Sequence, residues 1–269
     1  MKLTNLFESY LAVFSIGLKN TLAYKTDFIL SLFSSFFEAG LMIFIWTAIY
    51  HFTDVGSILG ITLPSMYAYF FLVSAFMFII NMDLPLNMQS DIQGGAVAVA
   101  YTRPLRYPMQ VFFKTVPSAI LSFFILTVPL LIIAMLLSHA SLSVLVSLLV
   151  VAELAVGYAL MSLIGFMIGM LAIKMVNITG IVNSLWSLIL LIGGGVVPLT
   201  LFPHVITGVL MLTPLPIMLY LPAATFLGMV SSSAAIGYIW INLAWLLGLA
   251  AVTALAWRST RRKITSAGG

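Results

Sequence analysis

The chain has 269 residues, of which 62% are hydrophobic and only 7% are charged. Soluble domains carry about 25% charged residues, so this composition excludes a soluble globular protein and indicates an integral membrane protein. The sequence contains no cysteine, which excludes disulfides, thiolate metal sites and cysteine nucleophiles, and in a membrane protein its net charge of +4 does not indicate a nucleic-acid partner.

The first predicted element is an amphipathic helix within residues 1–27. We expect it to lie in the membrane interface, where Lys19 and Lys25 would reach the lipid head groups. The alternative is that this segment is only an N-terminal extension of the first membrane span. Apolar residues recur at helical spacing along one face: Leu3, Leu6, Phe7, Tyr10, Phe14 and Leu18.

Six long apolar runs follow, separated by polar residues, glycine or proline. A membrane span needs about 20 apolar residues, so we predict an all-α polytopic membrane protein with six transmembrane helices. The second run is short and could begin earlier, near Ile61. The predicted spans are 28–50, 65–82, 109–138, 141–173, 178–199 and 234–257.

The basic residues indicate the orientation of these spans. With six spans, all 11 lysines and arginines fall on one side of the membrane. Cytoplasmic loops carry the excess of lysine and arginine, so we expect both termini in the cytoplasm and the protein in the cytoplasmic (inner) membrane. The residues concerned are Lys2, Lys19, Lys25, Arg103, Arg106, Lys114, Lys174, Arg258, Arg261, Arg262 and Lys263.

The polar segment 83–108, between spans two and three, is then cytoplasmic. We expect a short helix from about Leu86 to Asp91, a glycine break and a second helical piece. Asp91, Arg103 and Arg106 would be available to a protein partner. The alternative is a basic, lipid-facing loop that only sets the topology.

The last external connection, 200–233, is too apolar for a loop in water, and its prolines interrupt any single span. We expect a re-entrant helical hairpin that dips into the outer leaflet and is covered by protein. The glycines at the end of the fifth span would loosen it there, as an outer gate requires; close helix packing is the alternative. The candidate gate residues are Gly194, Pro198, Pro203 and Pro216.

Two acidic residues fall inside predicted spans, Glu38 in the first and Glu153 in the fourth. A carboxylate in the bilayer costs a few kcal/mol, so each is a candidate for a substrate pathway. The alternative is a packing role, with hydrogen bonds to nearby hydroxyl groups. The three histidines come from separate loops without ligand spacing, so no metal site is expected.

Three segments together resemble one family. Ile92, Gly95 and the pair Arg103–Pro104 resemble the cytoplasmic motif of ABC-2-type permeases, the membrane subunits of bacterial ABC exporters. The stretch "AYKTDFIL" is similar to the entry of that family's first span. The prolines of "GGGVVPLTLFPHVITGVLMLTPLPIMLYLPAATFLG" fall where the family has prolines.

The resemblance implies that 83–108 holds a coupling helix that docks on a separate ATP-binding subunit. The residues implied in this contact are Asp91, Ile92, Gly95, Arg103, Pro104 and Arg106.

It also implies that residues 1–269 form one permease domain that pairs with a second permease copy or paralogue. No phosphate-binding G-x-x-x-x-G-K-[ST] motif is present, so ATP and Mg²⁺ are expected on the partner subunit, and neither a cofactor nor enzyme activity is expected in this chain. The alternative function is a stand-alone secondary transporter or channel that uses Glu38 and Glu153. The sequence predicts no particular substrate.

Overall fold

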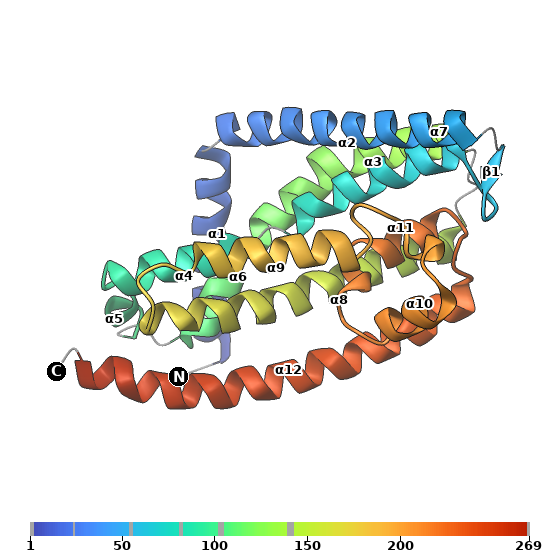
Figure 1. The fold of residues 1–269 in the computed structure, drawn as a ribbon. Helices are drawn as coiled ribbons and strands as arrows, with labels where there is room; N and C mark the ends of the chain where they lie inside the picture. The colour runs from blue at the N-terminus through green and yellow to red at the C-terminus, as the bar shows by residue number, and fades with distance from the viewer. Residues whose placement is uncertain are drawn as a thin grey trace.

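The computed structural model describes residues 3–23, 25–53, 56–80, 83–101, 105–138 and 143–267. These residues are almost entirely helical, and the longest helices run side by side (Figure 1). The helices are α1 (Leu3–Ala23), α2 (Lys25–Thr53), α3 (Leu63–Ile79), α4 (Asp83–Gln93), α5 (Ala96–Tyr101), α6 (Tyr107–Ser122), α7 (Val128–Ser138), α8 (Val144–Gly169), α9 (Thr179–Ile192), α10 (His204–Met211), α11 (Tyr220–Phe226) and α12 (Ser232–Ala267).

Five stretches among the described residues are long and apolar enough to cross a membrane. The last three, Tyr107–Ser138, Val144–Ile173 and Ser232–Ser259, agree with predicted spans to within three residues at each end. The first, Phe36–Thr53, begins later than the predicted 28–50, and the second, Leu63–Gln93, extends well past the predicted 65–82. The predicted fifth span, 178–199, is a 14-residue helix, α9, which ends at Ile192. At 1.5 Å per residue, α9 is about 21 Å long, less than the ~30 Å hydrocarbon layer. The six-span count therefore stays a prediction.

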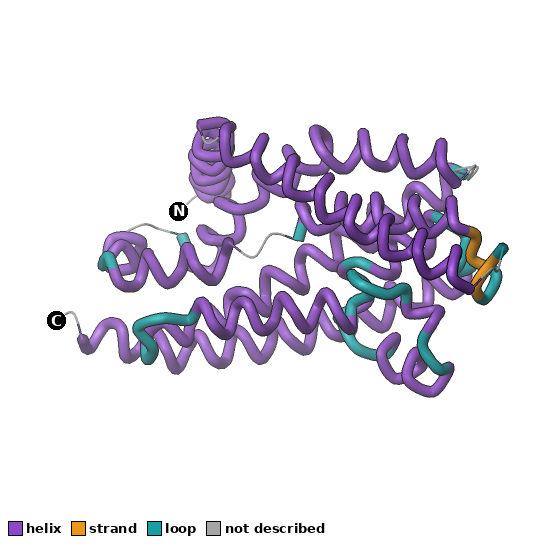
Figure 2. The backbone as a smooth tube through the Cα atoms, turned by 45° about the horizontal axis from the view of Figure 1, so that its top comes forward, coloured by secondary structure: helices purple, strands orange, loops and turns teal. Residues whose placement is uncertain are grey.

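Different elements lie at the two ends of the helix bundle. One end holds α4, α5, the turn 174–178 and the last turns of α12 (Figure 1). The opposite end holds the strand pair and the loops around α10 and α11 (Figures 1 and 2). Three basic residues lie near α4: Arg106 and Arg258 are chain neighbours of Tyr107 and Trp257, which pack beside α4, and Lys174 lies in the turn bonded to Gln93.

Helix α1 is separate from α2 and lies at a steep angle to it (Figure 1), so it is not a straight extension of the first span. It packs on α6, where the rings of Tyr10 and Phe113 lie 5.0 Å apart. At the contact, a Cβ on Gly17 would lie 2.3 Å from the carbonyl oxygen of Lys114. The buried residues Val13 and Gly17 therefore define the packed face of α1. Of the predicted apolar face, Tyr10, Phe14 and Leu18 are half-buried.

Two short antiparallel strands, β1 (Ser57–Ile58) and β2 (Ile61–Thr62), precede α3. The sequence predicts no strand here. The two central turn residues both have positive φ, 49° for Leu59 and 82° for Gly60, as a type I′ hairpin requires. Helix α3 then begins at Leu63 with Pro64 in its first turn and does not reach back to Ile61.

The predicted third span is interrupted by a π-helical turn over Phe123–Thr127, between α6 and α7. Proline cannot donate to the helical ladder and clashes with the carbonyl group four residues earlier, and Pro129 lies two residues after the end of this turn. The wider turn accommodates the proline. The hydroxyl group of Thr127 donates to the carbonyl oxygen of Ala75 in α3, at 3.0 Å.

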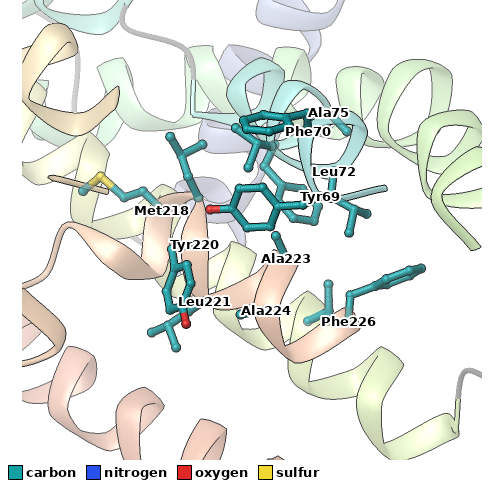
Figure 3. Packing of buried hydrophobic residues seen from close by; sticks show 14 of the residues in the cluster. Tyr69, Phe70, Leu72, Ala75, Met218, Tyr220, Leu221, Ala223, Ala224 and Phe226 are labelled. Carbon is teal, nitrogen blue, oxygen red and sulfur yellow. The ribbon is translucent and has the colours of Figure 1, made fainter. Parts of the chain in front are cut away.

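The main core lies where α3, α8 and α11 meet (Figure 3). Helix α3 buries residues on all sides, including Tyr69 and Phe76 at 0% exposure. Every residue of α11 is buried. The segment 199–226 contains short helical pieces, of which α11 is packed against protein whereas much of α10 is exposed. The re-entrant hairpin stays a prediction.

Candidate functional site

The segment after α3 forms two helices joined by a tight turn. Helix α4 ends at Gln93, the amide of Gly94 donates to the carbonyl oxygen of Ser90, and Gly95 has a φ of +72°. This left-handed conformation suits glycine, and α5 begins directly after it. The predicted helix, glycine break and second helical piece are all present, and α4 extends beyond the predicted Leu86–Asp91 at both ends.

Helix α4 packs closely on the end of α8. A Cβ on Gly169 would lie 2.6 Å from the sulfur of Met88, and a Cβ on Gly165 would lie 3.3 Å from the Cδ of Pro85. Met88 is fully buried and Leu84 is 6% exposed. Because both small residues of α8 face α4, the two helices approach closely and α4 has a defined position.

The predicted docking residues do not all face outward. The hydroxyl group of Tyr107 donates to Oδ2 of Asp91 at 3.3 Å, so Asp91 points toward the start of α6. Ile92 is half-buried and packs on two small apolar clusters. Arg106 is exposed just before α6. Arg103 and Pro104 lie outside the described residues.

The outward face of α4 consists of residues that the sequence analysis did not single out. Leu86, Asn87 and Ser90 are exposed. Leu86 and Ser90 lie opposite the buried Leu84 and Met88, and Asn87 lies at the edge of the exposed face. Helical periodicity could have identified them, because the buried and exposed positions of α4 alternate at the spacing of a helix.

An aromatic cluster holds α6, α8 and α12 together beside α4. The ring of Tyr107 stacks on Trp257 of α12, with centroids 5.4 Å apart. Phe166 of α8 contacts the same Trp257 edge-on at 5.2 Å. Three helices distant in the sequence therefore meet beside α4, and sequence patterns alone gave no sign of this contact.

The two membrane carboxyl groups lie in different surroundings. Glu38 is on the exposed surface of α2, next to the buried Ala39. Glu153 is fully buried, and its Oε1 accepts a hydrogen bond from the hydroxyl group of Thr225 in α11 at 2.9 Å. Oε2 of Glu153 has no hydrogen-bond partner among the described residues. The structure does not bring the two glutamates together.

At the opposite end, Gly194 is held tightly. Its carbonyl oxygen accepts from the hydroxyl group of Tyr69 at 2.6 Å. The amide of Tyr220 donates to the carbonyl oxygen of Gly193 at 3.0 Å. The end of α9 is thus bonded to α3 and to the start of α11.

The three candidate gate prolines each lie where a short helical piece begins. Pro198 precedes a 3-10 turn at Leu199–Leu201, Pro203 precedes α10, and Pro216 opens a second 3-10 turn at Pro216–Met218. Pro198 and Pro216 are buried, whereas Pro203 is exposed. As predicted, the prolines prevent one continuous helix. That they belong to an outer gate stays a prediction.

Comparisons with known proteins agree with the resemblance. A family model described as ABC-2 family transporter protein matches residues 36–268, most of the chain. No curated protein matches the sequence. With its apolar helices and this match, the chain belongs to the ABC-2 transporter family as a multi-pass membrane permease.

Proposed function

We propose that this permease is the membrane subunit of an ABC exporter and that α4 and α5 dock on a separate ATP-binding subunit. The observation that carries the proposal is the placement of α4. It is packed against Gly165 and Gly169 of α8 and exposes Leu86, Asn87 and Ser90 at the end of the bundle. A helix fixed on a long span can transmit a push from a partner into the membrane.

The sidedness of the proposal comes from the basic residues. Arg106, Lys174 and Arg258 lie close to α4, next to residues that pack on it or bond to it, and cytoplasmic loops are rich in lysine and arginine. This end faces the cytoplasm, where ATP is available. ATP and Mg²⁺ are bound by the partner, because this chain has no phosphate-binding loop motif.

The exporter works with a second permease copy or a paralogue. Glu38 is exposed on α2, and α9 exposes Asn183, Ser184 and Ser187. Polar and acidic groups that face lipid are costly, whereas the same groups at a helix interface are tolerated. A second copy packed on these faces would shield their polar and acidic side chains from lipid. The outer hairpin, 200–233, then re-enters the outer leaflet and opens a path to the outside.

If α4 docks on the ATP-binding subunit, a large side chain on the exposed face of α4 should prevent binding. Ser90→Trp should abolish co-purification with the ATP-binding subunit, because the indole ring would hold the two surfaces apart. Ser90→Ala leaves the face open and is the matched control, expected to bind as the unaltered chain does. Unchanged binding of the Ser90→Trp variant would contradict docking on this face.

The cysteine-free chain allows a direct test of sidedness. Single cysteines replace Asn87 on α4 and Ser57 on β1, both exposed. In intact cells, a membrane-impermeant maleimide should label Ser57→Cys but not Asn87→Cys, and permeabilised cells should show labelling at both. Labelling of Asn87→Cys from outside intact cells would overturn the proposed orientation and with it the ATP-binding partner.

A further inference from the structure

We propose that Gln89 and Gln93 couple α4 to α9, so that α9 acts as a lever between the docking end and the outer hairpin. This inference rests on the proposed function, because it describes how a push on α4 would reach the opposite end of the permease. Hydrogen bonds at each end of α9 support this inference.

The first contacts lie between α4 and the turn before α9. Oε1 of Gln89 accepts a hydrogen bond from the amide of Ile178 at 2.9 Å. Nε2 of Gln93 donates to the carbonyl oxygen of Val176. Both bonds join a side chain of α4 to backbone atoms more than 80 residues later, so they tie the two elements directly.

The beginning of α9 depends on this acceptor. Ile178 is the N-cap residue of α9, and its side chain has no atom that can accept a hydrogen bond. Asn177 Oδ1 accepts from the amide of Thr179 at 2.8 Å, and Gln89 supplies the acceptor for Ile178. Ile178 is fully buried, so loss of Gln89 would leave a buried amide without its partner, which costs about 1–3 kcal/mol.

Apolar packing reinforces the same joint. Ile178 forms a cluster with Ala172 and Val182, and Ile92 of α4 packs against it. Gln89 and Gln93 each lie three residues after an exposed residue, Leu86 and Ser90, so the side of α4 that holds α9 borders its exposed face. A push on the exposed face therefore acts directly beside the bonds to α9.

The far end of α9 is anchored as firmly. Gly193 and Gly194 accept the hydrogen bonds from Tyr220 and Tyr69 described above. Between its ends, α9 buries only Val182 and Ile189, and many of its other residues are exposed. A helix is stiff over 14 residues, so a helix held mainly at its ends carries a displacement from one end to the other.

One test uses the permease without its partner. Gln89→Met and Gln93→Met, combined, keep side-chain length but remove the bonding atoms. Hydrogen exchange should become faster at the amide of Ile178 and also at the amide of Tyr220, which donates to Gly193 at the other end of α9. Faster exchange at Ile178 with unchanged exchange at Tyr220 would show a purely local contact and overturn the lever.

A second test uses the complex with the ATP-binding subunit. A reporter cysteine replaces Leu191, which is 56% exposed near the end of α9, and its maleimide labelling rate is measured with and without ATP plus vanadate. The double Met variant should bind the subunit normally but lose the nucleotide-dependent change in labelling. Retention of that change would also overturn the lever.

Conservative variants separate this positioning role from a loss of folding. Gln89→Glu retains an acceptor for Ile178, and Gln93→Lys retains a donor for Val176, so each should restore the nucleotide-dependent change when the other glutamine is intact. If no ATP-binding subunit co-purifies with the unaltered chain, the proposed function fails. The hydrogen-exchange comparison does not need the partner, and it still decides whether α9 carries a displacement from α4 to its far end. Failure of the proposed function and failure of the lever can therefore be told apart.

Discussion

Replacing Gly194 with alanine is expected to destabilise the permease by about 2–5 kcal/mol, from the left-handed backbone and overpacking together. Gly194 has a φ of +89°, a conformation that disfavours any side chain. A Cβ there would also lie 2.7 Å from Cβ of Tyr220 and 2.8 Å from the hydroxyl oxygen of Tyr69. Thermal unfolding of the purified protein in detergent, followed by size-exclusion chromatography, should show a clearly lower midpoint.

Two other glycines separate the effect of the left-handed backbone from the effect of close packing. Gly228 has a φ of +70° with no atom within 4 Å of an added Cβ, so Gly228→Ala measures the backbone strain alone. Gly208 lies in α10, and an added Cβ would meet no atom within 4 Å, so Gly208→Ala should be neutral or slightly stabilising. We expect stability to fall in the order Gly208→Ala, Gly228→Ala, Gly194→Ala. Equal effects at Gly194 and Gly228 would contradict the close packing against Tyr220.

Replacing Glu153 with alanine is expected to cost about 2–5 kcal/mol, because it removes the acceptor of a buried hydroxyl group and leaves a cavity. Glu153 and Thr225 are 0% and 2% exposed, and their hydrogen bond joins α8 to α11. Glu153→Gln retains the amide oxygen as an acceptor for Thr225 and should unfold close to the unaltered protein. The measurement is again the thermal midpoint in detergent.

A double-mutant cycle tests whether the pair acts as one unit. If the contact is structural, the effects of Glu153→Ala and Thr225→Val should be clearly less than additive, because either change alone already breaks the bond. Additive effects would show that the bond contributes little. A stable Glu153→Gln protein that no longer supports transport would assign the carboxyl group to the substrate pathway instead.

The sequence predicted the long helices well because their signal is local. About 20 consecutive apolar residues are enough to indicate a span, and α2, α6 with α7, and α8 lie close to the expected ranges. The fifth span was predicted too long, because the apolar run continues past Gly193 although the helix ends at Ile192. Composition does not distinguish a membrane helix from the apolar, protein-covered segment that follows it.

Features that depend on distant residues were not predictable. The bond between Tyr69 and Gly194 joins positions 125 residues apart, and a single sequence contains no record of that pairing. The hairpin at Leu59–Gly60 was missed because its short strands lie between two strongly apolar runs. Asp91 was expected to face a partner, but the side-chain direction depends on Tyr107, which belongs to another helix.

The π turn before Pro129 changes the phase of the helix that contains it. One additional residue in a helical turn rotates everything after it by about 100°. The buried positions after the turn, Leu130 and Ala134, are displaced by one from the stripe that the buried positions of α6 would continue. Deleting a single residue from Phe123–Thr127 would therefore turn α7 about its axis and point its inner side chains away from α3.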